Sequence, residues 1–164
     1  MQRFYTESIK IEGGNIIGYQ TEDKAVNIFK GIPYAAPPVK SLRWKAPQPV
    51  QPWEGVKKCV SWEKVSIQPK QEAFMCWTKE FIIDDTPGYS EDCLYLNVWA
   101  SNDSTKNKPV IVFLHGGNFT TGGSSCEIYD GEHLARSGII FVSVDFRVGI
   151  LGMLAASVLS AENE

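Results

Sequence analysis

The segment "PVIVFLHGGNFTTGG" at residues 109–123 is the strongest indication of the fold class in this sequence. Residues 110–114 are apolar on both faces, as expected of a strand that is covered on both sides of its sheet. The run "IIFVSV" at 139–144 has the same character, and "IYDGEHLARSG" at 128–138 predicts a helix of about two turns that Gly138 ends. Strand, helix and strand in this order predict a parallel unit with a right-handed crossover, so the fold class is α/β.

The rest of the chain predicts short strands and irregular segments. Residues 8–30 hold three short apolar runs separated by turn residues, which predicts a meander of antiparallel strands. Six of the nine prolines lie between residues 33 and 52, so an ordered but irregular crossing is expected there. Residues 59–90 are rich in aromatics without a clean period and predict a long loop with a short helical turn. The segment "CLYLNVWA" at 93–100 alternates, with its leucines and Val98 on one face of a strand.

Composition argues against several classes of function. The 164 residues suit one domain, and the net charge of −3 without a basic stripe argues against nucleic acid as a partner. No run approaches the ~20 apolar residues of a membrane span. The opening "MQRFYTESIK" has no apolar core of a secretory signal, which favours the cytoplasm. The four cysteines form no C-x-x-C pair and are expected as buried or partly buried free thiols, with one disulfide among Cys59, Cys76 and Cys93 as the alternative.

The turn after residues 110–114 is the candidate functional site. In such sheets ligands bind beyond the carboxyl ends of the strands, and backbone without Cβ atoms can aim two N–H groups at one carbonyl oxygen that becomes an oxyanion. A tight strand exit without a ligand is an equal alternative from these residues alone, whereas a phosphate loop lacks its G-K-[ST] or G-x-G-x-x-G pattern. His115 is expected to be a buried histidine that braces the loop. A metal site from Cys126, Asp130 and His133 matches no familiar spacing, so no metal or cofactor is expected.

Five blocks of sequence, in order along almost the whole chain, resemble the type-B carboxylesterases, the group that includes cholinesterases and bacterial para-nitrobenzyl esterases. They are "FKGIPYAAPPVKSLRWKAPQPVQPWEGV" (29–56), "SEDCLYLNVW" (90–99), "VIVFLHGGNF" (110–119), "YDGEHLA" (129–135) and "VDFRVGILGML" (144–154). The resemblance implies carboxylic esters as small-molecule substrates. It also implies that residues 1–164 form a partial α/β-hydrolase domain, a small antiparallel meander followed by the first strands of the central mixed sheet.

The resemblance assigns roles to residues of the turn. The N–H groups of Gly117 and Asn118 are expected to be oxyanion-hole donors, and Gly116 to contribute to the loop geometry. Asn118 stands where many relatives have a third glycine or an alanine, and its side chain is expected to narrow the pocket or to contact substrate. Four aromatic residues are expected to bind substrate, namely Phe74, Trp77, Phe81 and Phe119.

Two further expectations from the resemblance are structural. Arg43 and Glu91 resemble a pair that forms a partly buried salt bridge in the family, so their role is expected to be in the scaffold. Cys93 resembles the second half of a family disulfide, but the usual first position near residues 66–68 has no cysteine, and Cys76 would be a displaced substitute.

The catalytic nucleophile of the family is missing from this sequence. No serine lies in a G-x-S-x-G elbow, and the catalytic Ser, acid and His are all expected beyond residue 164. The chain is therefore expected to be an N-terminal fragment that contributes the oxyanion hole, with the C-terminal remainder of the enzyme as its partner. A non-catalytic binding module of the same family and an inactive truncated remnant are the alternatives. In the chain alone, residues 110–114 are expected to form an open edge, because the strand that carries the nucleophile would pair beside them.

Overall fold

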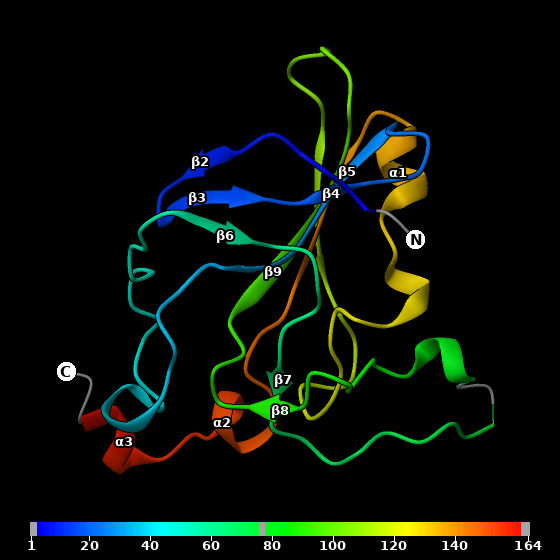
Figure 1. Cartoon of the computed structure of the whole chain (residues 1–164). Helices are drawn as coiled ribbons and strands as arrows, with labels where there is room; N and C mark the ends of the chain where they lie inside the picture. The colour runs from blue at the N-terminus through cyan, green and yellow to red at the C-terminus, as the bar shows by residue number, and fades with distance from the viewer. Residues whose placement is uncertain (1–2, 76–77, 162–164) are drawn as a thin grey trace.

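A mixed sheet runs through the middle of the molecule in the computed structural model, which describes residues 3–75 and 78–161 (Figure 1). Within these residues the sheet has six strands, in the order β1 (Phe4–Tyr5), β4 (Tyr19–Gln20), β5 (Val26–Pro33), β9 (Tyr95–Ser101), β11 (Ile140–Val144) and β10 (Val110–Leu114). β10 and β11 are parallel, with Val110 opposite Ile140, and β11 runs antiparallel to β9. The parallel unit predicted from the two apolar runs is therefore confirmed.

Two smaller sheets and short helices complete the described part of the fold. One sheet pairs β2 (Ile9–Ile11), β3 (Gly14–Ile17) and β6 (Val56–Lys58), and the other pairs β7 (Val65–Ser66) with β8 (Tyr89–Ser90). The α-helices are α1 (Glu132–Arg136), α2 (Gly149–Met153) and α3 (Ser157–Ala161), and single 3-10 turns lie at Lys40–Leu42, Lys79–Phe81 and Glu127–Tyr129. Figure 1 shows α1 on one side of the main sheet and β2, β3 and β6 on the other, with α2, β7 and β8 together at its lower end.

The long strands divide the apolar side chains between two cores, because successive residues of a strand point to opposite faces. The core beneath α1 consists of Val26, Ile28, Trp99, Ala135 and Phe141. The core beneath the three-stranded sheet consists of Ile16, Phe29, Ile32 and Cys59, against which Leu96 and Val98 pack. The alternation predicted for residues 93–100 is therefore confirmed.

The segment 128–138 is divided instead of forming one helix. A 3-10 turn ends at Tyr129, and α1 begins only at Glu132. Gly131 lies between them and approaches the core so closely that a Cβ there would be 2.4 Å from a ring atom of Phe141. The end of α1 is as predicted, since Gly138 adopts a φ of +84° just after the helix.

The predicted meander at residues 8–30 is wrong in one respect, because its strands belong to two sheets. β2 and β3 form an antiparallel hairpin, but β3 pairs in parallel with β6, whereas β4 and β5 lie in the main sheet. The chain passes between the sheets at Gly18, where a Cβ would lie 2.2 Å from the carbonyl oxygen of Ile28. The irregular crossing at 33–52 and the loop with a helical turn at 59–90 are confirmed, the loop also containing β7 and β8.

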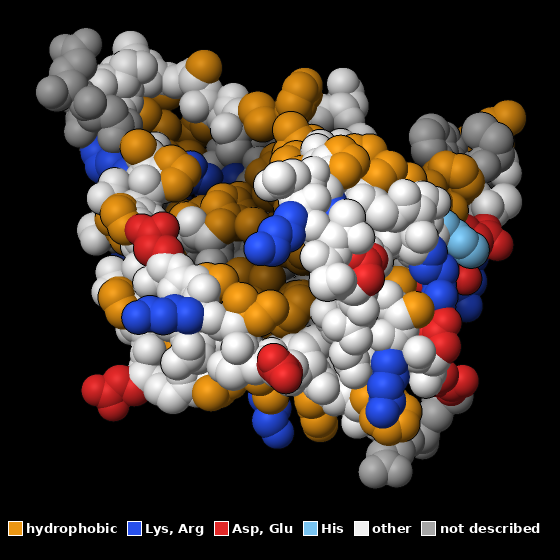
Figure 2. All heavy atoms as spheres, turned by 90° about the horizontal axis from the view of Figure 1, so that it is seen from above, with side chains coloured by type: hydrophobic (Ala, Val, Ile, Leu, Met, Phe, Trp, Pro, Cys, Tyr) orange, Lys and Arg blue, Asp and Glu red, His pale blue; other side chains and the backbone are white. Residues whose placement is uncertain are grey.

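β10 is the last strand at one edge of the main sheet, and the rest of the described chain does not cover its two faces. The exposed fractions of its residues are 57% for Val110, 42% for Ile111, 61% for Val112 and 62% for Leu114. α1 contacts β9, β11 and β5, so its cover is centred on the interior strands. The expected open edge is confirmed, and the expectation of a fully covered strand is wrong for this chain. Figure 2 views the molecule from above and shows hydrophobic side chains exposed on that face, some of them in a hollow near its middle.

Candidate functional site

The turn that follows β10 exposes backbone N–H groups at the carboxyl end of the strand. Three successive residues have positive φ, +117° at Gly117, +53° at Asn118 and +60° at Phe119. Asparagine tolerates this left-handed region better than most residues, which explains how Asn118 occupies a position that suits glycine. The Gly117 carbonyl accepts the N–H groups of Thr120 and Thr121 at 3.0 and 3.1 Å, which curls the chain. Within residues 3–75 and 78–161, the N–H groups of Gly117 and Asn118 have no hydrogen-bond acceptor.

Two glycines allow this turn to close. A Cβ on Gly117 would lie 1.9 Å from the carbonyl oxygen of Thr121, and one on Gly122 would lie 2.3 Å from that of Gly116. Gly116 was also expected to contribute to the loop geometry, but a Cβ there would have no heavy atom within 4 Å. The steric requirement for glycine therefore lies at Gly117 and Gly122, and the space beside Gly116 is open.

His115 is buried beside the turn and contacts its backbone. The residue is 6% exposed, and its ring stacks on Phe146 with the centroids 4.3 Å apart and the planes 7° from parallel. Its Nδ1 lies 2.8 Å from the carbonyl oxygen of Gly116, and because a carbonyl can only accept, Nδ1 is the donor. This arrangement agrees with the predicted role of His115 as a buried histidine that braces the loop.

Sequence reasoning missed two residues that hold the far end of the turn. Gln68 accepts the N–H of Gly122 at 2.6 Å through Oε1 and donates Nε2 to the Gly122 carbonyl at 2.8 Å. Asp145, directly after β11, is 7% exposed and accepts the Ser124 N–H at 2.7 Å. Burial raises the pKa of the Asp145 carboxyl, and the Ser124 hydrogen bonds and His115 act in the opposite direction. No local sequence pattern marks Gln68 or Asp145, because Gly122 and Ser124, to which they bond, are distant from them in sequence.

A cavity of about 570 Å³ lies against the turn and contains some of the expected aromatic residues. Phe74 and Phe81 line it together with Gly117 and Asn118, so the structure brings these two aromatic residues to the turn. Phe119 does not line this cavity; it borders another of about 460 Å³, with residues of α2. Trp77 lies outside the described residues. Contact of these side chains with a substrate stays a prediction.

Arg43 and Glu91 form the expected ion pair. Arg43 Nε lies 2.6 Å from Oε2 of Glu91, and Nη2 lies 2.6 Å from Oε1, which is a bidentate geometry. The Arg43 side chain is 43% exposed and that of Glu91 is 20% exposed, so the pair is not deeply buried. The hydrogen bonds from Arg43 lower the pKa of the Glu91 carboxyl. The pair ties the proline-rich crossing to the segment before β9, as expected of a scaffold contact.

The three cysteines that the structure describes form no disulfide, and no metal cluster forms among the described residues. Cys59, Cys93 and Cys126 are buried free thiols, and Cys76 lies outside the described residues. Burial raises the pKa of the Cys93 thiol to about 12 and that of Cys126 to about 11. In the described residues no group of three or more His, Cys, Asp or Glu side chains could hold a metal ion, so the alternative built on Cys126, Asp130 and His133 finds no support. No helix there has the length and apolar character to cross a membrane.

Among the described residues, the turn presents two N–H groups without an acceptor, and no exposed serine with an activating partner lies beside them. The sequence contains no G-x-S-x-G motif. Ser124 is the serine nearest to Gly122 in sequence, but it is 0% exposed, and its hydroxyl donates to Asp145 at 2.5 Å. The arrangement can therefore stabilise a negative oxygen, but the described residues do not offer an exposed, activated serine to generate one.

Comparison with known proteins agrees with the motifs. The sequence model described as "Carboxylesterase family" matches residues 5–162. The chain is 44% identical over 131 residues to a cholinesterase of Mus musculus, which covers 79% of this chain and 22% of that protein. It is 41% identical over 138 residues to para-nitrobenzyl esterase of Bacillus subtilis (strain 168), which covers 84% of this chain and 27% of that protein.

A solved structure of PNB esterase superposes with a TM-score of 0.80 at 36% identity, over 92% of this chain and 30% of that chain. This chain therefore spans less than a third of the length of these relatives. The fold is the N-terminal part of an α/β-hydrolase fold, as the resemblance implied. By sequence motif, family match and fold together, the chain belongs to the carboxylesterase family.

Proposed function

We propose that this chain supplies the oxyanion hole of a carboxylic ester hydrolase, and that the catalytic Ser, acid and His stand on sequence outside these 164 residues. The observation that carries the proposal is the pair of exposed N–H groups at Gly117 and Asn118, which lie at the carboxyl end of β10 beside a cavity of about 570 Å³. An ester carbonyl in this cavity would become an oxyanion when a serine attacks it, and the two N–H groups would bind that oxygen. Each such donor contributes about 2.7–4 kcal/mol to the transition state in serine hydrolases.

Two further observations support this function. The cavity lining includes Phe74, Phe81 and Tyr129, which suits the apolar part of an ester. The exposed edge of β10 offers unpaired backbone groups and apolar side chains to another strand, so the proposed remainder of the enzyme has a place to pair. The relatives named above are a cholinesterase and a para-nitrobenzyl esterase, and their names support an ester hydrolase as the whole enzyme.

The test compares the chain alone with a chimera. The chimera joins this chain to the part of the Bacillus subtilis para-nitrobenzyl esterase that lies beyond the matched segment, and turnover of p-nitrophenyl acetate and butyrate is measured. We expect no turnover above background from the chain alone, and saturable turnover from the chimera that a serine-directed phosphonate abolishes.

Two results would contradict the proposal. Saturable turnover by the 164-residue chain alone, blocked by the phosphonate, would show that it holds its own nucleophile. A folded, monodisperse chimera without turnover would show that this segment does not supply a working oxyanion hole. Circular dichroism and size-exclusion chromatography separate that second result from a failure to fold.

A further inference from the structure

A buried polar network lies beneath the candidate oxyanion turn and joins three elements of the fold. Asp145 follows β11, Ser124 lies in the segment after the turn, and Asn97 belongs to β9. Asp145 accepts both the N–H of Ser124, at 2.7 Å, and its hydroxyl, at 2.5 Å. Asn97 Nδ2 donates to the Ser124 hydroxyl at 2.8 Å and to the Ser143 hydroxyl at 3.1 Å. Its Oδ1 accepts the N–H of Gly31 in β5 at 2.9 Å, so the network joins β5, β9 and β11 of the main sheet.

The network is connected to the turn by close backbone contacts. Ser124 is separated from Gly122 by one residue, and both backbone polar groups of Gly122 are held by Gln68. Gly122 in turn lies so close to the start of the turn that a Cβ would be 2.3 Å from the Gly116 oxygen and 2.5 Å from His115 Nδ1. The backbone of Gly122 therefore lies against Gly116, the residue before the two candidate donors, and we expect a shift of residues 122–124 to displace it.

We propose that Asp145, acting through Ser124, is a positioning residue that sets the direction of the Gly117 and Asn118 N–H groups. The inference rests on the proposed function. A carboxyl group suits this position because its two oxygens accept the backbone N–H and the hydroxyl of one residue together. An alanine would leave both donors of a fully buried serine without a partner, and the segment would move to satisfy them. An asparagine has the same shape and keeps one acceptor for the Ser124 N–H.

A purely structural role would give a different outcome from a positioning role. If Asp145 only stabilises the fold, its loss lowers the folded fraction and leaves the kinetics of the folded enzyme unchanged. If it positions the donors, its loss weakens an interaction made in the transition state, so kcat falls while KM stays nearly constant.

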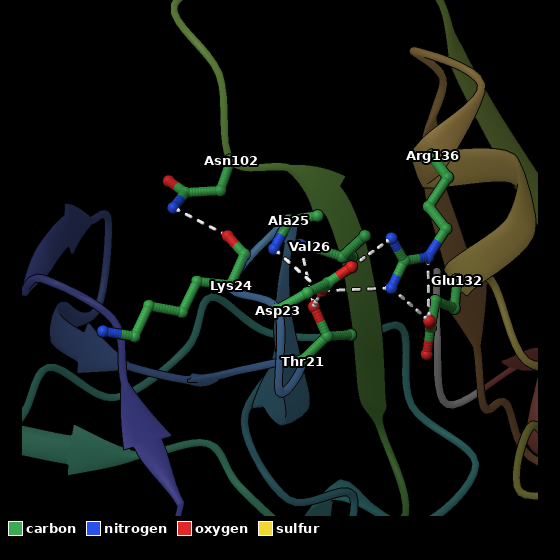
Figure 3. A network of polar contacts seen from close by, with 8 residues as sticks. All are labelled: Thr21, Asp23, Lys24, Ala25, Val26, Asn102, Glu132 and Arg136. Atoms are coloured by element: carbon green, nitrogen blue, oxygen red, sulfur yellow. Dashed lines mark hydrogen bonds and ion pairs between the residues drawn. The ribbon is translucent and has the colours of Figure 1, made fainter.

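Asp23 provides a matched control far along the chain from the turn. Its carboxylate accepts the Thr21 hydroxyl at 2.6 Å and the Ala25 N–H at 3.1 Å, so it also holds a hydroxyl and a backbone N–H. It pairs in addition with Arg136 of α1 at 2.7 Å (Figure 3). Asp23 does not line the cavity beside the turn, and D23A should therefore lower stability without changing the kinetics of the folded enzyme.

The experiment measures p-nitrophenyl butyrate hydrolysis by the chimera and its variants D145A, D145N, S124A and D23A. We expect D145A to lower kcat by about tenfold or more, with KM within about twofold, and S124A, which keeps the backbone N–H bond to Asp145, to have a smaller effect. We expect D145N to restore most of the activity, and D23A to leave kcat unchanged. A D145A variant with the kcat of the unsubstituted chimera would overturn the inference. So would a result in which D145A and D23A both lose activity only in proportion to the folded protein that each has lost.

A second measurement does not depend on ester hydrolysis. Hydrogen–deuterium exchange of the peptide that covers the turn should be faster in D145A than in the unsubstituted chimera, with D145N intermediate and D23A unchanged. Equal exchange in all four proteins would also overturn the inference. If the unsubstituted chimera folds but hydrolyses no ester, the proposed function fails, while the exchange result still decides whether Asp145 positions the turn.

Discussion

Alanine substitution at two adjacent glycines should separate the geometry of the turn from its composition. A Cβ on Gly117 would lie 1.9 Å from the Thr121 oxygen, and real Cβ contacts are essentially never closer than 3.0 Å. In Gly117→Ala the backbone at residue 117 or at Thr121 must therefore move by about 1 Å. The φ of +117° at Gly117 adds strain of ~1–3 kcal/mol for a residue with a side chain. At Gly116 a Cβ meets nothing within 4 Å, so the same substitution there is sterically free.

The expected size of the effect follows from the displacement. A misplacement of about 1 Å can cost about 100-fold in rate, and loss of a single oxyanion donor costs about 10²–10³ in kcat. We expect Gly117→Ala to lower the kcat of the chimera about 100-fold with little change in KM. Gly116→Ala should leave kcat nearly unchanged, because a Cβ there meets no heavy atom within 4 Å.

The assay is steady-state hydrolysis of p-nitrophenyl butyrate, together with the affinity for a phosphonate that mimics the tetrahedral intermediate. The affinity for that analogue should fall with kcat in Gly117→Ala, because both depend on the same N–H donors. An active Gly117→Ala enzyme with unchanged kcat, or equal losses in both variants, would refute the assignment of the donors.

Three further predictions concern charge and thiols. The hydrogen bond from Arg136 lowers the pKa of Asp23 in the folded protein. The contribution of the pair to stability should therefore be complete above the pKa of Asp23 in the unfolded chain, about 3.9, and be lost as the pH falls towards its pKa in the folded protein. Urea unfolding of Asp23→Asn and of the unsubstituted protein at several pH values checks this. Because the Arg43–Glu91 pair is partly exposed, Arg43→Met should lower the urea midpoint of unfolding only slightly, and the decrease should be smaller at high salt. A large decrease that does not depend on salt would contradict this. Iodoacetamide in mildly alkaline buffer should label the native protein slowly, and the urea-unfolded protein rapidly, at Cys59, Cys93 and Cys126.

Some features of the fold could not be predicted from short-range pattern. Gly18 and Gly131 each occur in a segment whose local sequence fits a continuous element, and in both cases close approach to another part of the chain interrupts it. The edge position of β10 depends on which strands are present to pair with it, and its apolar sequence is the same whether its faces are covered or open.

The sequence alone is enough to predict the family, the parallel unit and the turn at Gly117 and Asn118, because each depends on contiguous residues whose types are set by strand burial and backbone conformation. It also determined the Arg43–Glu91 pair, through resemblance of both flanking motifs. The contacts of Gln68 with Gly122 and of Asp145 with Ser124 become visible only in the folded chain. Gln68 reaches Gly122 across 54 positions and Asp145 reaches Ser124 across 21, and hydrogen bonds over such separations leave no period or spacing in the sequence.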